Sequence, residues 1–355
     1  MTPHEHILSV LETIKDPFLN LTGKEMGLKF NLDQNGAEYR LQLVCGFPAA
    51  PLQIKYVPLI ISALEQQLSA PIQVQLEEQI RPHRTQMAGK GLRGVKNIIA
   101  IASGKGGVGK STVAVNMATA LARAGARVGI LDADIYGPSI PLMLGKNAPL
   151  SIEDNQYLPI KAHSLEAMSI GYIADNDQAL IWRGPMLAKS LIQMLDSTRW
   201  DNLDYLFIDL PPGTGDIQLT LVQKIPLTAA IVVTTPQNVA TLDAQKAILM
   251  FKKTGIDVLG VVENMAIHHC SQCGHSEAIF GAGGAEILCR EQATRFLGQL
   301  PLNSEIRELA DNGNPIALHN NSISQEFLKI SLKAAIYLAQ KPINYADKFP
   351  EVIVE

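Results

Sequence analysis

Charged side chains are scarce in this chain of 355 residues: Asp, Glu, Lys and Arg together make up 18%, and the formal net charge is −4. Disordered chains and coiled coils carry far more charge, whereas the hydrophobic fraction of 47% is enough for a full core. Because no basic excess is present, neither nucleic acid nor an anionic membrane is expected as a partner.

Cysteine is also scarce, with four residues in the chain. Four are too few for a disulfide scaffold at this length, so we expect reduced thiols and a cytoplasmic protein. The first residues lack the basic and apolar regions of a secretory signal. No apolar run reaches the ~18 residues that a membrane-spanning helix needs.

The hydrophobic pattern predicts two domains joined by a linker. Residues 1–80 form a predicted α+β domain, and residues 81–96 are polar, basic and without periodicity, as in a solvated tether. The elements expected in the first domain are a helix over 7–14, a strand over 39–45, a helix that begins at Pro58 and ends at Leu68, and a strand over 72–76.

Residues 97–345 alternate continuous apolar runs with helical segments. The apolar runs are Ile98–Ala102, Val128–Leu131, Tyr205–Ile208, Ile231–Thr234 and Val258–Val262. The helical segments are 111–123, 238–253 and 323–340. Since strands buried on both faces belong to parallel sheets, we predict a doubly wound, mostly parallel α/β domain with its ligand at the carboxyl ends of the strands.

A glycine-rich turn follows the first of these strands. Its sequence is Gly104-Lys105-Gly106-Gly107-Val108-Gly109-Lys110-Ser111-Thr112, and it contains the Gly-x4-Gly-Lys-Ser pattern of a P-loop between a strand and a helix. Glycines let backbone N–H groups approach phosphates, and the helix N-terminus favours anions. We therefore expect ATP here, with Lys110 on the β- and γ-phosphates and Ser111 on Mg²⁺.

Acidic residues end two of the predicted strands. Asp132 and Asp134 lie one pleat apart, so both carboxylates can face the phosphates. Asp209 ends the third strand and suits Mg²⁺ through a bound water. The Gly- and Pro-rich segment 210–216 follows it and could sense the γ-phosphate. Each aspartate could instead be a helix N-cap, although three of them beside a P-loop make that interpretation weak.

Lys105 is a second lysine within the loop, and through it the chain resembles the deviant Walker A class, which includes the MinD and ParA ATPases and nitrogenase iron protein. The resemblance implies that Lys105 reaches across a dimer interface to the partner's nucleotide. It also implies that Asp134 activates or orients the attacking water, with Asp132 nearby. Asn264, after the strand over 258–262, is the implied contact to the nucleotide base, and a turn asparagine is the alternative.

Cys270 and Cys273 form a C-x-x-C pair in a polar, His-flanked loop. Zinc and [4Fe–4S] clusters normally take four protein ligands, so this loop supplies half a site. A two-fold dimer could give two plus two. Alternatively, one chain could complete a zinc site with His268, His269, His275 or Cys289. Cys289 and Cys45 are assigned to packing or to a surface thiol rather than to a metal.

With these residues in place, the chain resembles the Mrp/ApbC family of iron–sulfur cluster carrier ATPases over residues ~95–340. Beside the P-loop and the Cys pair, the matching motifs are Leu131–Ser139, Trp182–Met186, Asp209–Asp216, Val262–Met265 and Ile279–Gly281. The first domain more weakly resembles the small iron–sulfur assembly domain often fused to this ATPase.

The resemblance implies a homodimer in which Cys270 and Cys273 of both copies hold one [4Fe–4S] cluster. It further implies slow ATP hydrolysis, receipt of the cluster from upstream scaffolds, and transfer to recipient apo iron–sulfur proteins. Two alternatives stay open. One is a MinD/ParA-type positioning ATPase, which would need a membrane helix or a basic DNA face and would leave the Cys pair without a role. The other is a zinc-stapled P-loop ATPase without cluster transfer.

Overall fold

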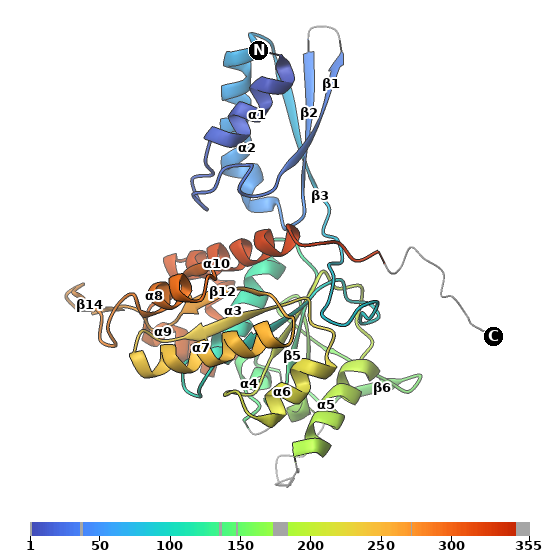
Figure 1. The fold of residues 1–355 in the computed structure, drawn as a ribbon, viewed down its shortest axis with the longest axis vertical. Helices are drawn as coiled ribbons and strands as arrows, with labels where there is room; N and C mark the ends of the chain where they lie inside the picture. The colour runs from blue at the N-terminus through green and yellow to red at the C-terminus, as the bar shows by residue number, and fades with distance from the viewer. Residues whose placement is uncertain are drawn as a thin grey trace. The chain divides into compact units, whose positions relative to one another are not determined.

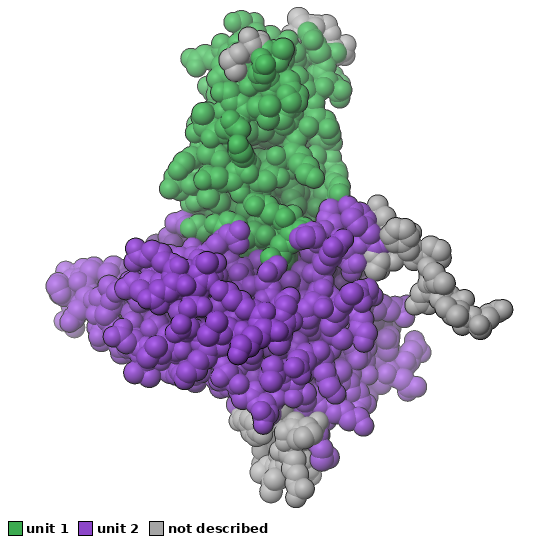
Figure 2. Space-filling view, viewed as in Figure 1, with its two compact units in different colours: residues 1–81, 332–341 green, residues 82–331, 342–355 purple. Residues whose placement is uncertain are grey.

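The computed structural model describes residues 2–35, 38–134, 137–146, 148–172, 184–270 and 272–345. The chain divides into two compact units (Figure 2), of which the first comprises residues 1–81 and 332–341 and the second residues 82–331 and 342–355. Among the described residues, no helix has both the length and the apolar character that crossing a bilayer requires.

The first unit contains a sheet of order β1-β2-β3, with β1 antiparallel and β3 parallel to β2. Its elements are α1 (Pro3–Thr13), β1 (Lys29–Asn35), β2 (Glu38–Cys45), α2 (Ala50–Leu68) and β3 (Ile72–Glu78). Thr2 and Glu5 form a capping box that starts α1. Leu41, Leu43 and Cys45 alternate along β2 on its buried face, as the sequence predicts.

The prediction that the second helix begins at Pro58 is wrong. Helix α2 begins at Ala50, and Pro51 occupies the first turn, where a missing N–H costs nothing. Pro58 lies inside the helix on its exposed side, and the helix continues through it because Leu52, Tyr56, Val57, Ile60 and Leu64 form one buried stripe.

The second unit is built on an eight-stranded sheet of order β15-β12-β11-β4-β10-β5-β9-β8 (Figure 1). All neighbouring pairs are parallel except β8 and β9, which confirms the predicted doubly wound, mostly parallel α/β class. The strands are β4 (Ile98–Ala102), β5 (Val128–Asp132), β8 (Ile160–Ala162), β9 (Leu165–Ser169), β10 (Tyr205–Asp209), β11 (Ala229–Thr234), β12 (Val258–Glu263) and β15 (Phe296–Gln299).

Helices connect these strands or follow the last of them, and two short hairpins lie in the loops. The helices are α3 (Lys110–Arg123), α4 (Ile140–Met143), α5 (Gly184–Ser197), α6 (Asp216–Lys224), α7 (Asn238–Lys253), α8 (Gly284–Glu291), α9 (Ser304–Asp311) and α10 (Ser322–Ala339), with 3₁₀ turns at Ile170–Tyr172 and Ile316–Leu318. The hairpins are β6 (Ser151–Glu153) with β7 (Gln156–Leu158), and β13 (His268–His269) with β14 (Ser276–Glu277).

Every residue of β4, β5, β10 and β11 is buried, so these strands form the centre of the core. Their parallel direction places the residues that follow them at one edge of the sheet. The P-loop after β4, Asp132 at the end of β5, Asp209 at the end of β10 and Asn264 after β12 are therefore brought together.

Candidate functional site

Glycines let the P-loop pass between its neighbours. A Cβ at Gly104 would lie 2.0 Å from the backbone carbon of Asp243 in α7, so only glycine fits against that helix. Gly109 precedes α3 with φ of 78°, in the left-handed region where a side chain would be strained. The cradle is thus formed by backbone, and its N–H groups lead into the N-terminus of α3, as phosphate binding requires.

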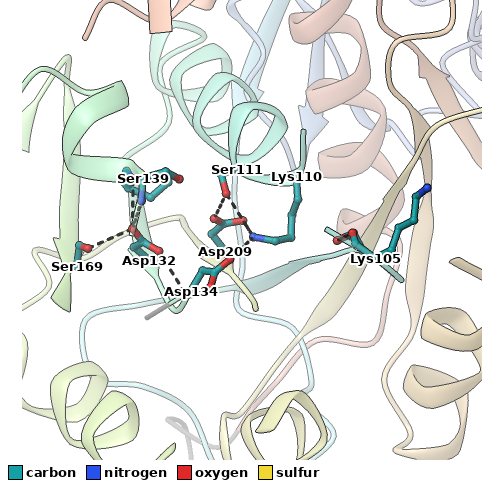
Figure 3. A network of polar contacts seen from close by, with 10 residues as sticks. Lys105, Lys110, Ser111, Asp132, Asp134, Ser139, Ser169 and Asp209 are labelled. Atoms are coloured by element: carbon teal, nitrogen blue, oxygen red, sulfur yellow. Dashed lines mark hydrogen bonds and ion pairs between the residues drawn. The ribbon is translucent and has the colours of Figure 1, made fainter. Parts of the chain in front are cut away.

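Lys110, Ser111 and Asp209 form the centre of the site (Figure 3). Lys110 Nζ donates to Asp209 Oδ1 at 2.6 Å, and Ser111 Oγ donates to Asp209 Oδ2 at 2.6 Å. Lys110 is 6% exposed and Asp209 is fully buried. The groups expected to hold phosphate and magnesium therefore contact one another in this structure.

Asp132 is fully buried and holds the loop that follows β5. Its Oδ2 accepts hydrogen bonds from the backbone N–H groups of Ser139 and Ile140, both at 3.1 Å, and from the Ser169 hydroxyl at 3.2 Å. Burial and the negative charge of Asp209 raise the pKa of Asp132. Asp132 thus positions the loop rather than facing an open site.

Asp134 lies closer to where a phosphate would sit. Its Oδ2 is 4.0 Å from Lys110 Nζ, and its side chain is 17% exposed. With Asp132 and Asp209 it places three carboxylates around one buried lysine. The Ser111 hydroxyl and the Asp209 carboxylate, which lie 2.6 Å apart, are oxygen ligands of the kind that Mg²⁺ prefers, so this pair fits a magnesium ion that also binds phosphate.

Lys105 points away from this cluster, and its ammonium lies on the far side of the loop from Lys110 (Figure 3). The residue is half-buried, and its carbonyl accepts a hydrogen bond from the Ser103 hydroxyl at 2.9 Å. In the described ranges, no carboxylate lies within ion-pairing distance of its ammonium. This direction suits a contact outside the chain's own nucleotide site.

Asn264 contacts the P-loop itself. It is 6% exposed, and its Nδ2 donates to the Val108 carbonyl at 2.9 Å. Its backbone N–H donates to the carbonyl of Thr234, at the end of β11, at 2.8 Å. To contact the nucleotide base, the Asn264 amide would have to share or give up its bond to the Val108 carbonyl. The base contact stays a prediction.

The Cys pair lies in a tight turn between β13 and β14. The backbone N–H of Cys270 donates to the His275 carbonyl, the N–H of Gly274 donates to the Cys270 carbonyl, and both distances are 2.9 Å. The backbone N–H groups of Cys273 and then Gln272 stabilise the thiolate of Cys270 and lower its pKa. A thiolate so prepared is a metal ligand and a nucleophile.

The two other cysteines are inert by comparison. Burial raises the pKa of Cys45 to about 12 and that of Cys289 to about 11. The Cys45 thiol donates to the Phe47 carbonyl, and the Cys289 thiol donates to the Arg295 carbonyl. Both thiols are buried, which agrees with the packing role predicted for Cys45 and with one of the two roles predicted for Cys289.

Completion of a zinc site within one chain has no preformed basis among the described residues, where no group of three or more Cys, His, Asp or Glu side chains could hold a metal ion. His268 is engaged with the Leu302 carbonyl at 3.2 Å, and His269 with the Ser276 hydroxyl at 2.8 Å.

Sequence reasoning did not find Ser139, Ser169 or Met265. The Ser139 backbone N–H and the Ser169 hydroxyl both donate to Asp132, and Met265 is distinguished by its φ of 58°, which its residue type does not predict. Ile135, Tyr136, Trp182 and Arg183, which belong to the motifs of the resemblance, lie outside the described residues.

A family model described as ParA, the NUBPL iron-transfer P-loop NTPase, matches residues 94–335. The chain belongs to this family. The match spans the P-loop, the aspartates, Asn264 and the Cys pair, so the resemblance to iron–sulfur carrier ATPases drawn from those motifs is confirmed.

Relatives called iron–sulfur cluster carrier protein cover much of the chain. The one from Haemophilus influenzae is 58% identical over 251 residues, which span 70% of this chain and 68% of that protein. The one from Escherichia coli K12 is 59% identical over 230 residues, spanning 64% of this chain and 62% of that protein. The one from Deinococcus radiodurans is 42% identical and spans 92% of this chain and 93% of its own length.

Solved structures support the same fold. A nucleotide-binding protein from Archaeoglobus fulgidus in complex with ADP is 37% identical, with a TM-score of 0.57, over 64% of this chain and 90% of that one. The cell division ATPase MinD of Pyrococcus furiosus, 23% identical with a TM-score of 0.50, covers 67% of this chain and 97% of that one, and shows the fold alone.

Proposed function

We propose that this chain is an ATP-binding and hydrolysing carrier of an iron–sulfur cluster, which holds a [4Fe–4S] cluster between two copies and transfers it to apo-proteins. The observation that carries the proposal is the exposed turn of Cys270 and Cys273. It offers two free thiols, and among the described residues no group of three or more Cys, His, Asp or Glu side chains could hold a metal ion. Membership of an iron-transfer family supports the same function.

ATP binds at the P-loop, with its phosphates on the backbone cradle and on Lys110. To do so, Lys110 and Ser111 give up hydrogen bonds to Asp209, whose carboxylate then faces the cation site. Mg²⁺ would be held by Ser111 and, through water, by Asp209, and would neutralise phosphate charge.

Hydrolysis joins a water oxygen to the γ-phosphorus and breaks the bond to the ADP oxygen, and the water's proton passes to the Asp134 carboxylate or to an oxygen of the γ-phosphate. The distance of 4.0 Å between Asp134 Oδ2 and Lys110 Nζ supports Asp134 as the residue that orients that water. Lys105 points away from Lys110 of its own chain and would add its charge to the γ-phosphate of the nucleotide bound by a second copy.

A homodimer gives Lys105 its target and the cluster its four ligands. Apolar side chains on α7, the helix that packs against the P-loop, support this assembly: Val239 and Leu242 are 64% and 59% exposed. The neighbouring Asp243 of α7 is in contact with Gly104. Exposed apolar residues grouped at a functional edge are typical of a protein interface.

The cluster is cargo. Each Cys thiolate releases iron as a thiolate of the recipient takes its place, so donors exchange without oxidation or reduction. We expect upstream scaffolds to supply the cluster and apo iron–sulfur proteins to receive it. Free thiols in all four cysteines suit the cytoplasm. The predicted N-terminal domain, residues 1–80, resembles an assembly domain, but its Cys45 side chain is buried and exposes no thiol.

Anaerobic reconstitution with iron and sulfide tests the proposal, since one cluster per dimer requires about two irons per chain and a visible absorption band. Cys270→Ala removes two ligands at once in a symmetric dimer and should abolish the band, while ATP binding survives. Cys289→Ala is the matched control and should keep the cluster.

A colourless protein with about one zinc per chain would instead establish the zinc-stapled alternative. A positioning ATPase would retain activity in Cys270→Ala and bind no iron, since the Cys pair has no role in that mechanism.

A further inference from the structure

A short segment of the chain connects the P-loop to the Cys pair. It begins at Asn264, whose amide holds the Val108 carbonyl of the P-loop at 2.9 Å, and reaches Cys270 six residues later. A Cβ at Gly109 would lie 2.3 Å from Asn264 Nδ2 and 3.6 Å from Met265 Cε. The two residues are therefore packed directly on the loop that receives the nucleotide.

Met265 holds an uncommon backbone conformation at this junction. Its φ of 58° lies in the left-handed region, which residues other than glycine seldom adopt. Such conformations persist where surrounding contacts impose them, and they cluster at switch regions. Here the contacts are those of Asn264 with the P-loop on one side and of Ala266 with the next strand on the other.

From Ala266 onward the segment is held by hydrogen bonds up to the Cys turn. Ala266 N–H donates to the Leu300 carbonyl at 2.9 Å, and the Ile267 carbonyl accepts from Leu302 N–H at 2.8 Å. His268 and His269 then form β13, which pairs with β14 around the Cys turn. A displacement at Asn264 would therefore be carried along a paired segment instead of being absorbed by a loose loop.

Glu263 closes the base of the same loop. Its side chain is buried, and Oε1 accepts a hydrogen bond from the N–H of Ala285 in α8 at 2.8 Å. Its carbonyl accepts from Leu300 N–H at 2.8 Å. Both ends of the loop that carries Cys270 and Cys273 are thus fixed next to Asn264. A change at the nucleotide site can therefore reach the loop through Asn264 and Met265.

We propose that Asn264 and Met265 are positioning residues that couple nucleotide binding at the P-loop to the geometry and reactivity of the Cys270–Cys273 turn. A nucleotide that moves the Val108 carbonyl, or takes the Asn264 amide, breaks the bond that holds Asn264. Met265 then loses the contact that imposes its left-handed backbone, and the paired segment shifts at the Cys turn. The inference rests on the proposed function, in which that turn binds the cargo.

The test measures alkylation of Cys270 and Cys273 by N-ethylmaleimide in the full, metal-free chain, using peptide mass spectrometry. Rates are compared without nucleotide and with saturating Mg-ADP or a non-hydrolysable ATP analogue. Cys45 and Cys289 are buried, so the fast phase reports the pair alone. We expect nucleotide to change the rate by at least about fivefold, the lower end of typical coupling between sites.

Asn264→Ala should abolish this change at nucleotide concentrations shown by calorimetry to saturate the variant. Asn303→Ala is the matched control. Asn303 lies just after the residues that pair with the segment, and its side chain caps α9 by accepting a hydrogen bond from the N–H of Glu305, which is not part of the P-loop. This variant should keep the nucleotide effect. If Asn264→Ala binds no nucleotide, Met265→Gly is the second test, because it retains the Asn264 amide. We expect Met265→Gly to lose the effect of nucleotide on the alkylation rate.

Two results would overturn the proposal: alkylation rates in the natural protein that ignore nucleotide, or a full nucleotide effect in a nucleotide-bound Asn264→Ala protein. Because the protein is free of metal, the outcome does not depend on the identity of the cargo. A zinc-binding result would refute the carrier function and leave this coupling intact, whereas lost coupling would leave iron content unchanged.

Discussion

Lys110 is the cation of a buried cluster as well as the expected phosphate ligand. Asp209 is fully buried and within 2.6 Å of its ammonium, and Asp132 is buried nearby. A carboxylate left in such surroundings without its cation is costly, which makes the lysine necessary for the nucleotide-free fold too.

Lys110→Ala should therefore abolish ATP binding and also lower the free energy of unfolding by about 3 kcal/mol, because it leaves buried charge uncompensated. Urea denaturation without nucleotide checks the stability, and calorimetry checks the binding. Lys105→Ala is the control, since Lys105 is half-buried outside this cluster and should change stability little. Equal stability of the two variants would contradict the structural role of Lys110.

Asp204 ties together the starts of three strands in the second unit. Its carboxylate accepts from Lys96, just before β4, at 2.8 Å and from Arg127, just before β5, at 3.2 Å, and it lies next to β10. Burial by itself would raise the pKa of Asp204, but the hydrogen bonds from Arg127 and Lys96 outweigh it and lower the pKa.

A lowered pKa means that the charged form of Asp204 stabilises the fold above the pKa of the unfolded chain, and that this contribution disappears as pH falls through the folded value. Asp204→Asn should cost about 1.5 kcal/mol at pH 7, at the low end for bonds to charged groups because Arg127 is half exposed. In urea titrations, the deficit should shrink below about pH 4. A deficit that stays constant down to pH 3 would refute the assignment.

For the secondary-structure elements, the sequence predicts the central strands and the long helices well. Ile98–Ala102 and Asn238–Lys253 coincide with β4 and α7, because fully apolar runs and long helical periods are strong signals. The predicted start of α2 is wrong because Pro51 and Pro58 both suit the first turn of a helix. Only the buried stripe of the helix shows that Pro51 occupies that turn and that Pro58 lies within the helix.

In the site, likewise, contacts between residues of recognisable motifs are predicted from the sequence, and contacts without a local motif are not. Lys110, Ser111 and Asp209 were predicted to share a site from a contiguous motif and a strand end, and they do lie together. The bond from Asn264 to Val108 joins residues 156 positions apart and has no local signature. Met265 was missed because its backbone conformation follows from the contacts on both sides rather than from its residue type.

For the whole molecule, the decisive question is whether Lys105 acts in the other copy. In the structure its ammonium points away from Lys110 and Asp209 of its own chain (Figure 3). A dimer would place each Lys105 against the partner's nucleotide, so Lys105→Ala and Lys110→Ala would each inactivate ATP hydrolysis, but by damaging different sites of the assembly.

Mixing the two inactive variants should therefore restore hydrolysis. In a mixed dimer, the Lys105→Ala chain keeps a site with an intact Lys110, and the Lys110→Ala chain supplies that site with Lys105. Random exchange of equal amounts gives half mixed dimers with one complete site in two, hence about a quarter of the natural rate. Phosphate release against the mixing ratio measures this, with each variant alone as the control. Activity that never rises above the separate variants would assign Lys105 to its own chain's nucleotide, or to no role in hydrolysis.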